Sequence, residues 1–178
     1  MSSFYDYSVP TPNGEQVSMK DFEGKVVLVV NTATGCGFTP QYKELQEIYN
    51  EFHDKGLEIL DFPCNQFGDQ APGTNEEIHT FCTGRFGITF PQFSKLDVLG
   101  ENADPLFVWL SENTKFEGFG KGAKAMLMNA MLHGIPKENP DIRWNFTKFI
   151  VDRQGHVVAR FEPTADMADV DKCVATLL

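Results

Sequence analysis

The sequence has no long hydrophobic segment and little positive charge. No apolar run is longer than that of Val26 to Val30, which is far shorter than the roughly 20 residues that a helix needs to cross a bilayer. The 15 Lys and Arg residues are outnumbered by 25 Asp and Glu residues, so the formal net charge is −10. Nucleic-acid-binding proteins and proteins that bind anionic membranes usually carry a basic surface. The composition therefore argues against both of these classes and against a membrane-spanning protein.

Cysteine is scarce as well, and its spacing argues against two common kinds of site. The four cysteines are Cys36, Cys64, Cys82 and Cys173, and none of them forms a C-x-x-C pair. No histidine stands at a ligand-like distance from them, so we expect neither a structural metal site nor a disulfide scaffold. Residues 1–10 contain no basic or apolar leader. We therefore expect a cytoplasmic protein whose thiols are kept reduced.

The order of the predicted elements indicates one α/β domain spanning residues 1–178. A chain of this length buries one sizeable core. Strands that alternate with helices and then end in a hairpin predict a mixed central sheet flanked by helices. In chain order we expect an N-terminal hairpin around 12–14, a strand at 25–31, a helix at 40–55, a strand at 57–62, helices that open at 75 and 105, strands at 146–151 and 156–161, and a closing helix at 169–178.

Capping signals mark the start of three of these helices. Thr39 is expected to be an N-cap, with Pro40 at the first helical position. The sequence Thr74 to Glu77 is typical of a capping box. Asp104, which is followed by a proline, is expected to begin the third helix.

Cys36 is the first candidate for chemistry. It lies between Gly35 and Gly37, which leave its sulfur accessible, and it follows a predicted buried strand. It also precedes a predicted helix, whose free N–H groups stabilise negative charge on a thiolate. A free cysteine is nevertheless most often a small buried apolar residue. These local features alone leave a reactive Cys36 and a structural Cys36 both open.

Two other polar segments are expected near the same end of the sheet. Residues 65–70 follow the second predicted strand, and ligands and reactive groups gather at the carboxyl ends of such strands. Trp144 and Asn145 stand at the start of a later strand. They reach this end of the sheet only if that strand runs antiparallel to the first two.

Three motifs in this order resemble the signatures of the glutathione peroxidase family. They are Asn31 to Thr39, Phe62 to Gly68 and Trp144 to Phe149, with Asn75 to Ile78 between the second and the third. The resemblance covers essentially the whole chain. It implies a thioredoxin-like fold and a thiol-dependent peroxidase that reduces hydrogen peroxide and organic hydroperoxides. It also implies that no cofactor is bound, because an external thiol reductant supplies the electrons.

The resemblance also implies a catalytic set of four residues. Cys36 matches the position whose thiolate attacks the peroxide and becomes a sulfenic acid, and it could stand in for a native selenocysteine. Gln70, Trp144 and Asn145 match the other three positions. Their N–H groups are hydrogen-bond donors that can stabilise the thiolate and the leaving oxygen. Without the resemblance, Trp144 would be read as a core residue, and Gln70 and Asn145 as turn formers.

Cys82 matches the position of a resolving cysteine in the cysteine-containing members of this family. In this role it would condense with the Cys36 sulfenic acid to form a disulfide. The alternative is a buried helix cysteine with no role in turnover. The two sulfurs lie on different predicted elements and can start beyond disulfide range, so we expect the Cys82 helix to unwind locally during turnover. Cys64 and Cys173 are interpreted as packing residues.

The electron donor is left open by the sequence. With Cys82 as the resolving residue, thioredoxin or a similar dithiol protein is the natural reductant. Without it, glutathione or glutaredoxin would reduce Cys36 directly. A peroxide sensor that relays oxidation to a partner protein would use the same two cysteines.

The segment 113–143 is longer than in compact members of the family. It carries an apolar stripe at helical spacing, formed by Ala123, Met126, Leu127, Ala130 and Met131. Such a stripe either packs onto its own domain or joins two copies of the chain. We expect the second, and therefore a homo-oligomer.

Overall fold

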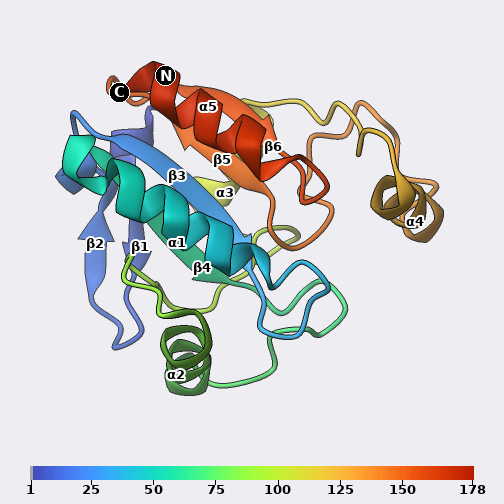
Figure 1. Cartoon of the computed structure of the whole chain (residues 1–178), viewed down its shortest axis with the longest axis horizontal. Coiled ribbons are helices and arrows are strands. Elements are labelled where there is room, and N and C mark those ends of the chain that lie inside the picture. The colour runs from blue at the N-terminus through green and yellow to red at the C-terminus, as the bar shows by residue number, and fades with distance from the viewer. Residues whose placement is uncertain (1) are drawn as a thin grey trace.

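A four-stranded mixed sheet forms the centre of the computed structural model, which describes residues 2–178 (Figure 1). The strand order is β4-β3-β5-β6. β3 pairs with β4 in parallel, whereas β5 runs antiparallel to both β3 and β6. The bounds of these strands are Val26–Thr32 for β3, Leu57–Pro63 for β4, Lys148–Val151 for β5 and Val157–Phe161 for β6. The predicted mixed sheet is therefore confirmed.

Helices cover both faces of this sheet, and β3 and β4 are accordingly buried along their whole length. Most of their side chains are apolar, and the polar exceptions are Asn31, Thr32, Glu58 and Asp61. Side chains alternate between the two faces of a strand. Leu28 and Val30 pack in one apolar cluster with α1 (Gln41–Phe52), α2 (Asn75–Phe86) and α5 (Met167–Leu177). Val27 and Val29 pack on the opposite face with α3 (Pro105–Glu112).

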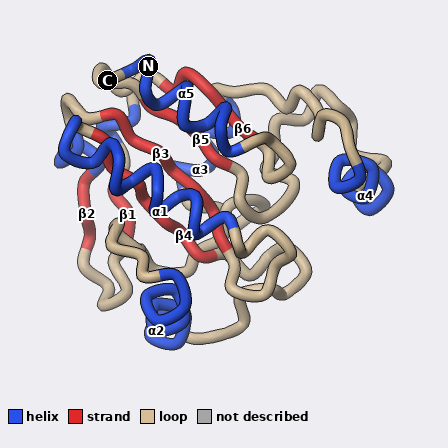
Figure 2. Tube along the Cα trace, viewed as in Figure 1, coloured by secondary structure: helices blue, strands red, loops and turns tan. Residues whose placement is uncertain are grey.

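Two further segments lie beside this core. The predicted N-terminal hairpin is present as the antiparallel pair β1 (Ser8–Pro10) and β2 (Gln16–Ser18). The helix α4 (Ala123–Met131) stands away from the sheet, and Figure 2 shows long loops on both sides of it. Short 3-10 helices complete the chain at Phe4–Asp6, Met19–Phe22 and His53–Lys55. No helix within residues 2–178 is long and apolar enough to cross a membrane.

The start of α1 differs from the prediction, because Thr39 is not its N-cap. The helix begins at Gln41, and Pro40 occupies the capping position without a side-chain cap. The hydroxyl of Thr39 instead accepts a hydrogen bond from the Cys36 N–H (2.9 Å) and donates one to the Ala33 carbonyl (2.8 Å). Buried polar groups need hydrogen-bond partners, and the backbone of this turn uses the Thr39 hydroxyl as a partner. The hydroxyl is therefore not available to cap the helix.

The predicted strand at 146–151 begins two residues late. Phe146 has a φ of +64°, a left-handed conformation that interrupts an extended strand. Its N–H still donates to the Asn31 carbonyl (2.6 Å), which holds this segment against the end of β3. The regular ladder then starts at Lys148.

The predicted capping signal of α2 is present. The Thr74 hydroxyl oxygen accepts from the Glu77 N–H (3.2 Å), and the same hydroxyl donates to the Glu77 carboxylate (3.1 Å). Gly87, with a φ of +62°, ends the helix. Both ends of α2 are thus closed by local interactions, although only Ile78 and Cys82 of this helix are buried. Few buried contacts make a helix one of the less stable parts of a fold.

We expect Thr74→Ala to lower the free energy of unfolding by about 1 kcal/mol, because it removes the N-cap of α2. Urea denaturation followed by circular dichroism measures this difference. Thr80→Ala is the matched control, since Thr80 is exposed in the middle of the same helix. Equal stability of the two variants would show that the cap contributes nothing.

Candidate active site

Three segments that are distant in the sequence meet beyond the carboxyl end of β3. The Cys36 turn follows β3, the loop that carries Gln70 follows β4, and Trp144 and Asn145 precede β5. Because β5 runs antiparallel to β3, its beginning lies at this same end. The predicted convergence of the three segments required β5 to run antiparallel to β3, and the structure shows this direction.

Hydrogen bonds join these segments directly. The Gly35 N–H donates to the Gln70 carbonyl (2.8 Å), which ties the Cys36 turn to the loop after β4. The Asn31 side chain donates from Nδ2 to the Trp144 carbonyl (3.1 Å). The Asn145 Nδ2 donates to Gln70 Oε1 (3.0 Å). The candidate site is therefore one connected network, although its members come from three parts of the chain.

Cys36 is held at the mouth of this network. Its side chain is only 7% exposed, and Sγ accepts a hydrogen bond from the Phe38 N–H (3.3 Å). The hydroxyl of Thr39 fixes the Cys36 backbone from the other side. An N–H donor directed at sulfur stabilises the negative charge of a thiolate. The turn itself thus supplies the first such donor, from its own backbone.

Asn145 orients Gln70. Asn145 is fully buried, and its Nδ2 donates both to Gln70 Oε1 and to the Phe67 carbonyl (3.3 Å). Since Oε1 of Gln70 is occupied as an acceptor, the Nε2 end of its amide is the end left to donate. Within residues 2–178, Gln70 Nε2 makes no hydrogen bond. Gln70 is half-buried, so this donor is available to a molecule that enters the site.

Gly68 makes room for the Gln70 side chain. It has a φ of +73°, and a Cβ at this position would lie 3.1 Å from Gln70 Nε2. A side chain here would therefore be strained and would also press on the amide. The sequence motif contained this glycine, but only the structure shows that the Gln70 side chain occupies the space that a side chain at position 68 would need.

Trp144 is half-buried at the edge of the site. Its ring packs against that of Phe67 with 5.9 Å between the ring centroids, and it borders the apolar clusters on both faces of the sheet. Indole has a single N–H donor and no acceptor. No group within residues 2–178 accepts a hydrogen bond from it. Trp144 can therefore pack against the core with its ring and still donate a hydrogen bond from its indole N–H.

The other three cysteines lie in different surroundings. Cys64 and Cys82 are completely buried, and Cys173 is half-buried on α5. Burial, together with the negative charge of the nearby Asp61 carboxylate, raises the pKa of the Cys82 thiol to about 11. Burial likewise raises the pKa of Cys64 to about 11. Cys82 packs in the same apolar cluster as Cys36, but all four thiols are free.

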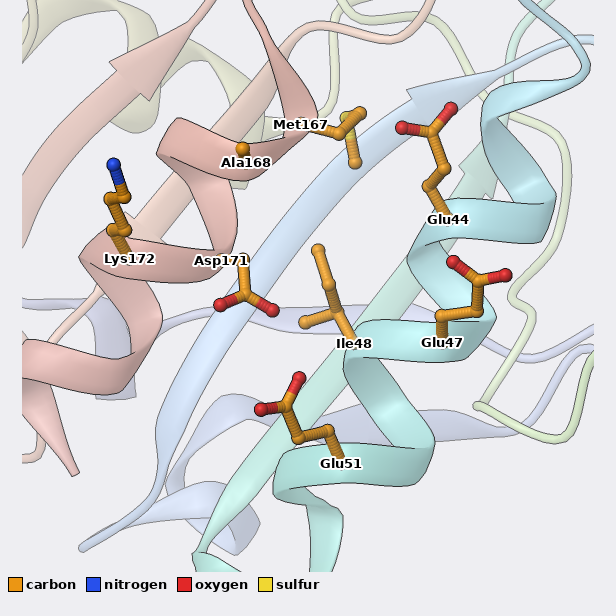
Figure 3. Close-up of a pocket in the computed structure, with 8 residues that line it drawn as sticks. All are labelled: Glu44, Glu47, Ile48, Glu51, Met167, Ala168, Asp171 and Lys172. Carbon is orange, nitrogen blue, oxygen red and sulfur yellow. The ribbon is translucent and has the colours of Figure 1, made fainter.

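A separate groove lies between α1 and α5, and no cysteine lines it (Figure 3). Its volume is about 340 Å³. Figure 3 shows Glu44, Glu47 and Glu51 on α1 opposite Asp171 and Lys172 on α5. Within residues 2–178, no cluster of three or more His, Cys, Asp or Glu side chains is arranged to hold a metal ion. The groove is acidic, and it contains none of the residues of the candidate site.

Sequence comparison shows which proteins this chain is similar to. The family model described as glutathione peroxidase matches residues 4–111. Hydroperoxy fatty acid reductase gpx1 of Synechocystis sp. is 47% identical over 96% of this chain and 95% of its own length. Glutathione peroxidase-like peroxiredoxin 2 of Saccharomyces cerevisiae is 44% identical over 99% of this chain and 98% of its own length.

Structural comparison gives the same result for the fold. The crystal structure of Trgpx in its apo form has a TM-score of 0.72 and 31% identity, covering 99% of this chain and 95% of that one. A thiol:disulfide interchange protein of the thioredoxin family from Chlorobium tepidum has a TM-score of 0.58 at 19% identity, covering 96% and 92%. The predicted thioredoxin-like fold is therefore confirmed.

We expect iodoacetamide at neutral pH to modify Cys36 first and Cys173 more slowly, while Cys64 and Cys82 stay unmodified in the folded protein. Burial and a raised pKa keep these last two thiols neutral and inaccessible. Timed quenching and peptide mass mapping give the four rates. Denatured protein is the control, since all four cysteines should then react at similar rates. Modification of Cys82 as fast as Cys36 in the folded protein would contradict the burial shown here.

Proposed function

Since the chain belongs to the glutathione peroxidase family and is a peroxidase that reduces hydroperoxides with thiols, we propose that Cys36 is the thiol that reacts with the peroxide. The observation that carries this proposal is the position of Cys36. It is the one thiol that lies on the turn joined by hydrogen bonds to Gln70, and through Gln70 to Asn145.

The first step is an attack of the Cys36 thiolate on one peroxide oxygen. A sulfur–oxygen bond forms, the oxygen–oxygen bond breaks, and the leaving oxygen takes a proton and departs as water or an alcohol. Sulfur is thereby oxidised to a sulfenic acid, and the peroxide is reduced. The Phe38 N–H stabilises the thiolate, while Gln70 Nε2 and the Trp144 indole N–H donate to the oxygen on which charge develops.

Asn145 acts in this proposal as a positioning residue. It contacts Gln70 rather than sulfur, and it fixes which end of the Gln70 amide faces the site. Donors that are already oriented need no reorganisation during the reaction. The site therefore uses neutral amide, indole and backbone donors. We propose that it needs no prosthetic group, because an external thiol supplies the electrons.

We propose that Cys82 resolves the sulfenic acid. Its sulfur attacks Sγ of Cys36, a disulfide forms, the sulfur–oxygen bond breaks, and water is released. The two residues share one apolar cluster, and α2, which carries Cys82, has few buried contacts of its own. The disulfide would then be reduced by thioredoxin or a similar dithiol protein. The yeast relative named a peroxiredoxin supports a route of this kind.

Direct reduction by glutathione is the second candidate, and one observation favours it. Cys36 is 7% exposed whereas Cys82 is fully buried, so an external thiol reaches the Cys36 sulfenic acid without any opening of α2. For the substrate we propose hydrogen peroxide and organic hydroperoxides. The cyanobacterial relative, named for hydroperoxy fatty acids, supports the organic class. We place the reaction in the cytoplasm, where reductants keep thiols reduced.

Addition of one equivalent of hydrogen peroxide to the reduced protein should produce a Cys36–Cys82 disulfide, detected by peptide mass mapping. Cys82→Ser should instead leave a sulfenic acid on Cys36, and Cys64→Ser, the matched control, should form the disulfide normally. Amide exchange over residues 78–86 should rise on oxidation, because α2 must open for the two sulfurs to meet.

Three results would redirect the proposal. Cys36→Ser should abolish peroxide turnover and leave the fold intact, so residual turnover would remove Cys36 from its role. Oxidation of Cys36 alone in the unaltered protein would favour glutathione as the reductant. A single oxidation with no sustained turnover, together with a trapped partner protein, would favour a peroxide sensor.

We further propose that two copies of the chain associate through α4. The stripe predicted from the sequence is exposed on this helix: Met126 is 73% exposed, Leu127 59% and Met131 47%. The opposite side of α4, with Ala125 and Met128, is buried. The exposed stripe is thus apolar surface that the chain itself does not cover.

Light scattering coupled to size-exclusion chromatography should therefore show an oligomer at micromolar concentration. Leu127→Lys should dissociate it, because a charge would be buried in the contact. Asn129→Lys, on an exposed position of the same helix, is the control and should leave the assembly intact. A monomer in the unaltered protein would show that the stripe is not an interface.

A further inference from the structure

A buried carboxylate without a counter-ion lies behind the candidate site. Asp61, on β4, is fully buried. It accepts hydrogen bonds from the hydroxyl of Thr32, from the hydroxyl of Tyr42 (2.9 Å) and from Nε2 of Gln92 (2.8 Å). No Lys or Arg within residues 2–178 forms an ion pair with it. A buried charge that only neutral donors satisfy costs stability, and the peroxide-reducing step described above does not use it.

Two of these donors also adjoin Cys82. Tyr42, from α1, packs in the same buried cluster as Cys82. Tyr42 and Gln92 both bond to Asp61, and both lower the pKa of the Cys82 thiol. His79, one turn before Cys82 on α2, holds the other end of the Gln92 amide through Nδ1 (3.0 Å). The cluster therefore links a thiol on α2, a hydroxyl on α1 and a carboxylate on β4.

The protonation states of this cluster follow from burial. Burial raises the pKa of Asp61 to about 6, with the three hydrogen bonds and His79 acting in the opposite direction. Burial also raises the pKa of Tyr42 well above its ordinary value and that of Cys82 to about 11. At neutral pH the cluster thus holds a thiol, a phenol and a carboxylate. The other titratable group that faces Asp61 is His79, which is exposed and separated from the thiol by Gln92.

A neutral buried thiol is a poor nucleophile, because the thiolate is the attacking form. We propose that Asp61 accepts, through the hydroxyl of Tyr42, the proton that Cys82 must lose in order to attack the Cys36 sulfenic acid. The inference rests on the resolving role proposed for Cys82. It assigns to that role a proton acceptor that the peroxide-reducing site does not contain.

The step balances in atoms and electrons. Tyr42 passes its hydroxyl proton to Asp61 and takes the proton of the Cys82 thiol. The Cys82 sulfur then bonds to Sγ of Cys36, the sulfur–oxygen bond breaks with its electron pair, and the departing hydroxide takes a proton back from Asp61 to become water. The sulfenic sulfur is reduced and the Cys82 sulfur is oxidised.

Two consequences make the transfer effective. The charge of Asp61 is one cause of the raised pKa of Cys82, so neutralising this carboxylate lowers the thiol pKa as the proton moves. A thiolate left in an apolar cluster is costly. Its formation therefore favours the opening of α2, which brings Cys82 to Cys36.

Rapid mixing of the reduced protein with one equivalent of hydrogen peroxide, followed by quenching with an alkylating reagent, separates the two steps. Mass mapping then gives the rate of Cys36 oxidation and the rate at which the Cys36–Cys82 disulfide forms, which is called closure below. In Asp61→Asn we expect oxidation within about twofold of the unaltered protein, since the reacting atoms are untouched. We expect closure to slow by about 100-fold, the low end of what a general base contributes.

The pH profile distinguishes proton transfer from a structural effect. Closure in the unaltered protein should accelerate as pH rises from 5 to 7, because Asp61 accepts a proton only as a carboxylate and its pKa is about 6. In the unaltered protein this rise should level off above that pKa, whereas in Asp61→Asn closure should be slower and should keep rising with pH, because it then depends only on the thiolate fraction of Cys82. Tyr42→Phe keeps the packing and the carboxylate but removes the relay, and should slow closure at every pH. Asp104→Asn, at the N-cap of α3, is the control and should leave both rates unchanged.

The outcomes separate this inference from the proposed function. A Cys36–Cys82 disulfide that closes at an unchanged or faster rate in both Asp61→Asn and Tyr42→Phe would overturn the role of Asp61 and leave the two-cysteine route standing. Closure of the unaltered protein at one rate across pH 5 to 7 would do the same, even if Asp61→Asn failed to fold. Absence of the disulfide in the unaltered protein would overturn both.

Discussion

The pairing of β3 with a parallel neighbour on one side and an antiparallel neighbour on the other decides where the residues of the candidate site meet. A parallel neighbour places the loop after β4 beside the turn after β3. An antiparallel neighbour places the beginning of β5 at that same end. Cys36, Gln70 and Asn145 meet for this reason alone, and the buried hydrogen bonds among them are possible only once the sheet has formed.

In the proposed mechanism, the site stabilises charge without a fixed positive group. Its donors are a backbone N–H at Cys36, an amide oriented by a second amide, and an indole. Each of these needs to be held in place, since a neutral donor is effective only when its direction is set in advance. Thr39 fixes the turn and Asn145 fixes Gln70, while Gly68 leaves the space in which the amide sits. Neutral donors held in fixed positions thus replace a positively charged group.

The two cysteines of the family pattern differ in what they require from the fold. Cys36 sits on a turn held by several hydrogen bonds, and the proposed reaction with peroxide requires no movement of this turn. Cys82 is enclosed on α2, a helix with closed ends and few buried side chains. We expect such a helix to keep its thiol buried in the folded state and to have a low free energy of local unfolding, so that the thiol can become accessible. The unpaired carboxylate of Asp61 beneath it is a stability cost that the resolving step would explain.

The amino-acid sequence by itself determined the fold class, the hairpin, the central strands and the helix caps at Thr74 and Asp104, because periodicity and capping are local properties. Its three motifs also indicated the family and the candidate site residues. The tertiary structure alone decided that Thr39 bonds into the Cys36 turn rather than capping a helix, that Phe146 interrupts its strand, and that Asp61 faces Cys82. The physical reason is distance along the chain: the Asn145–Gln70 and Asn31–Trp144 bonds join residues 75 and 113 positions apart. Local sequence cannot report which partner a buried polar group will meet when that partner arrives from another element.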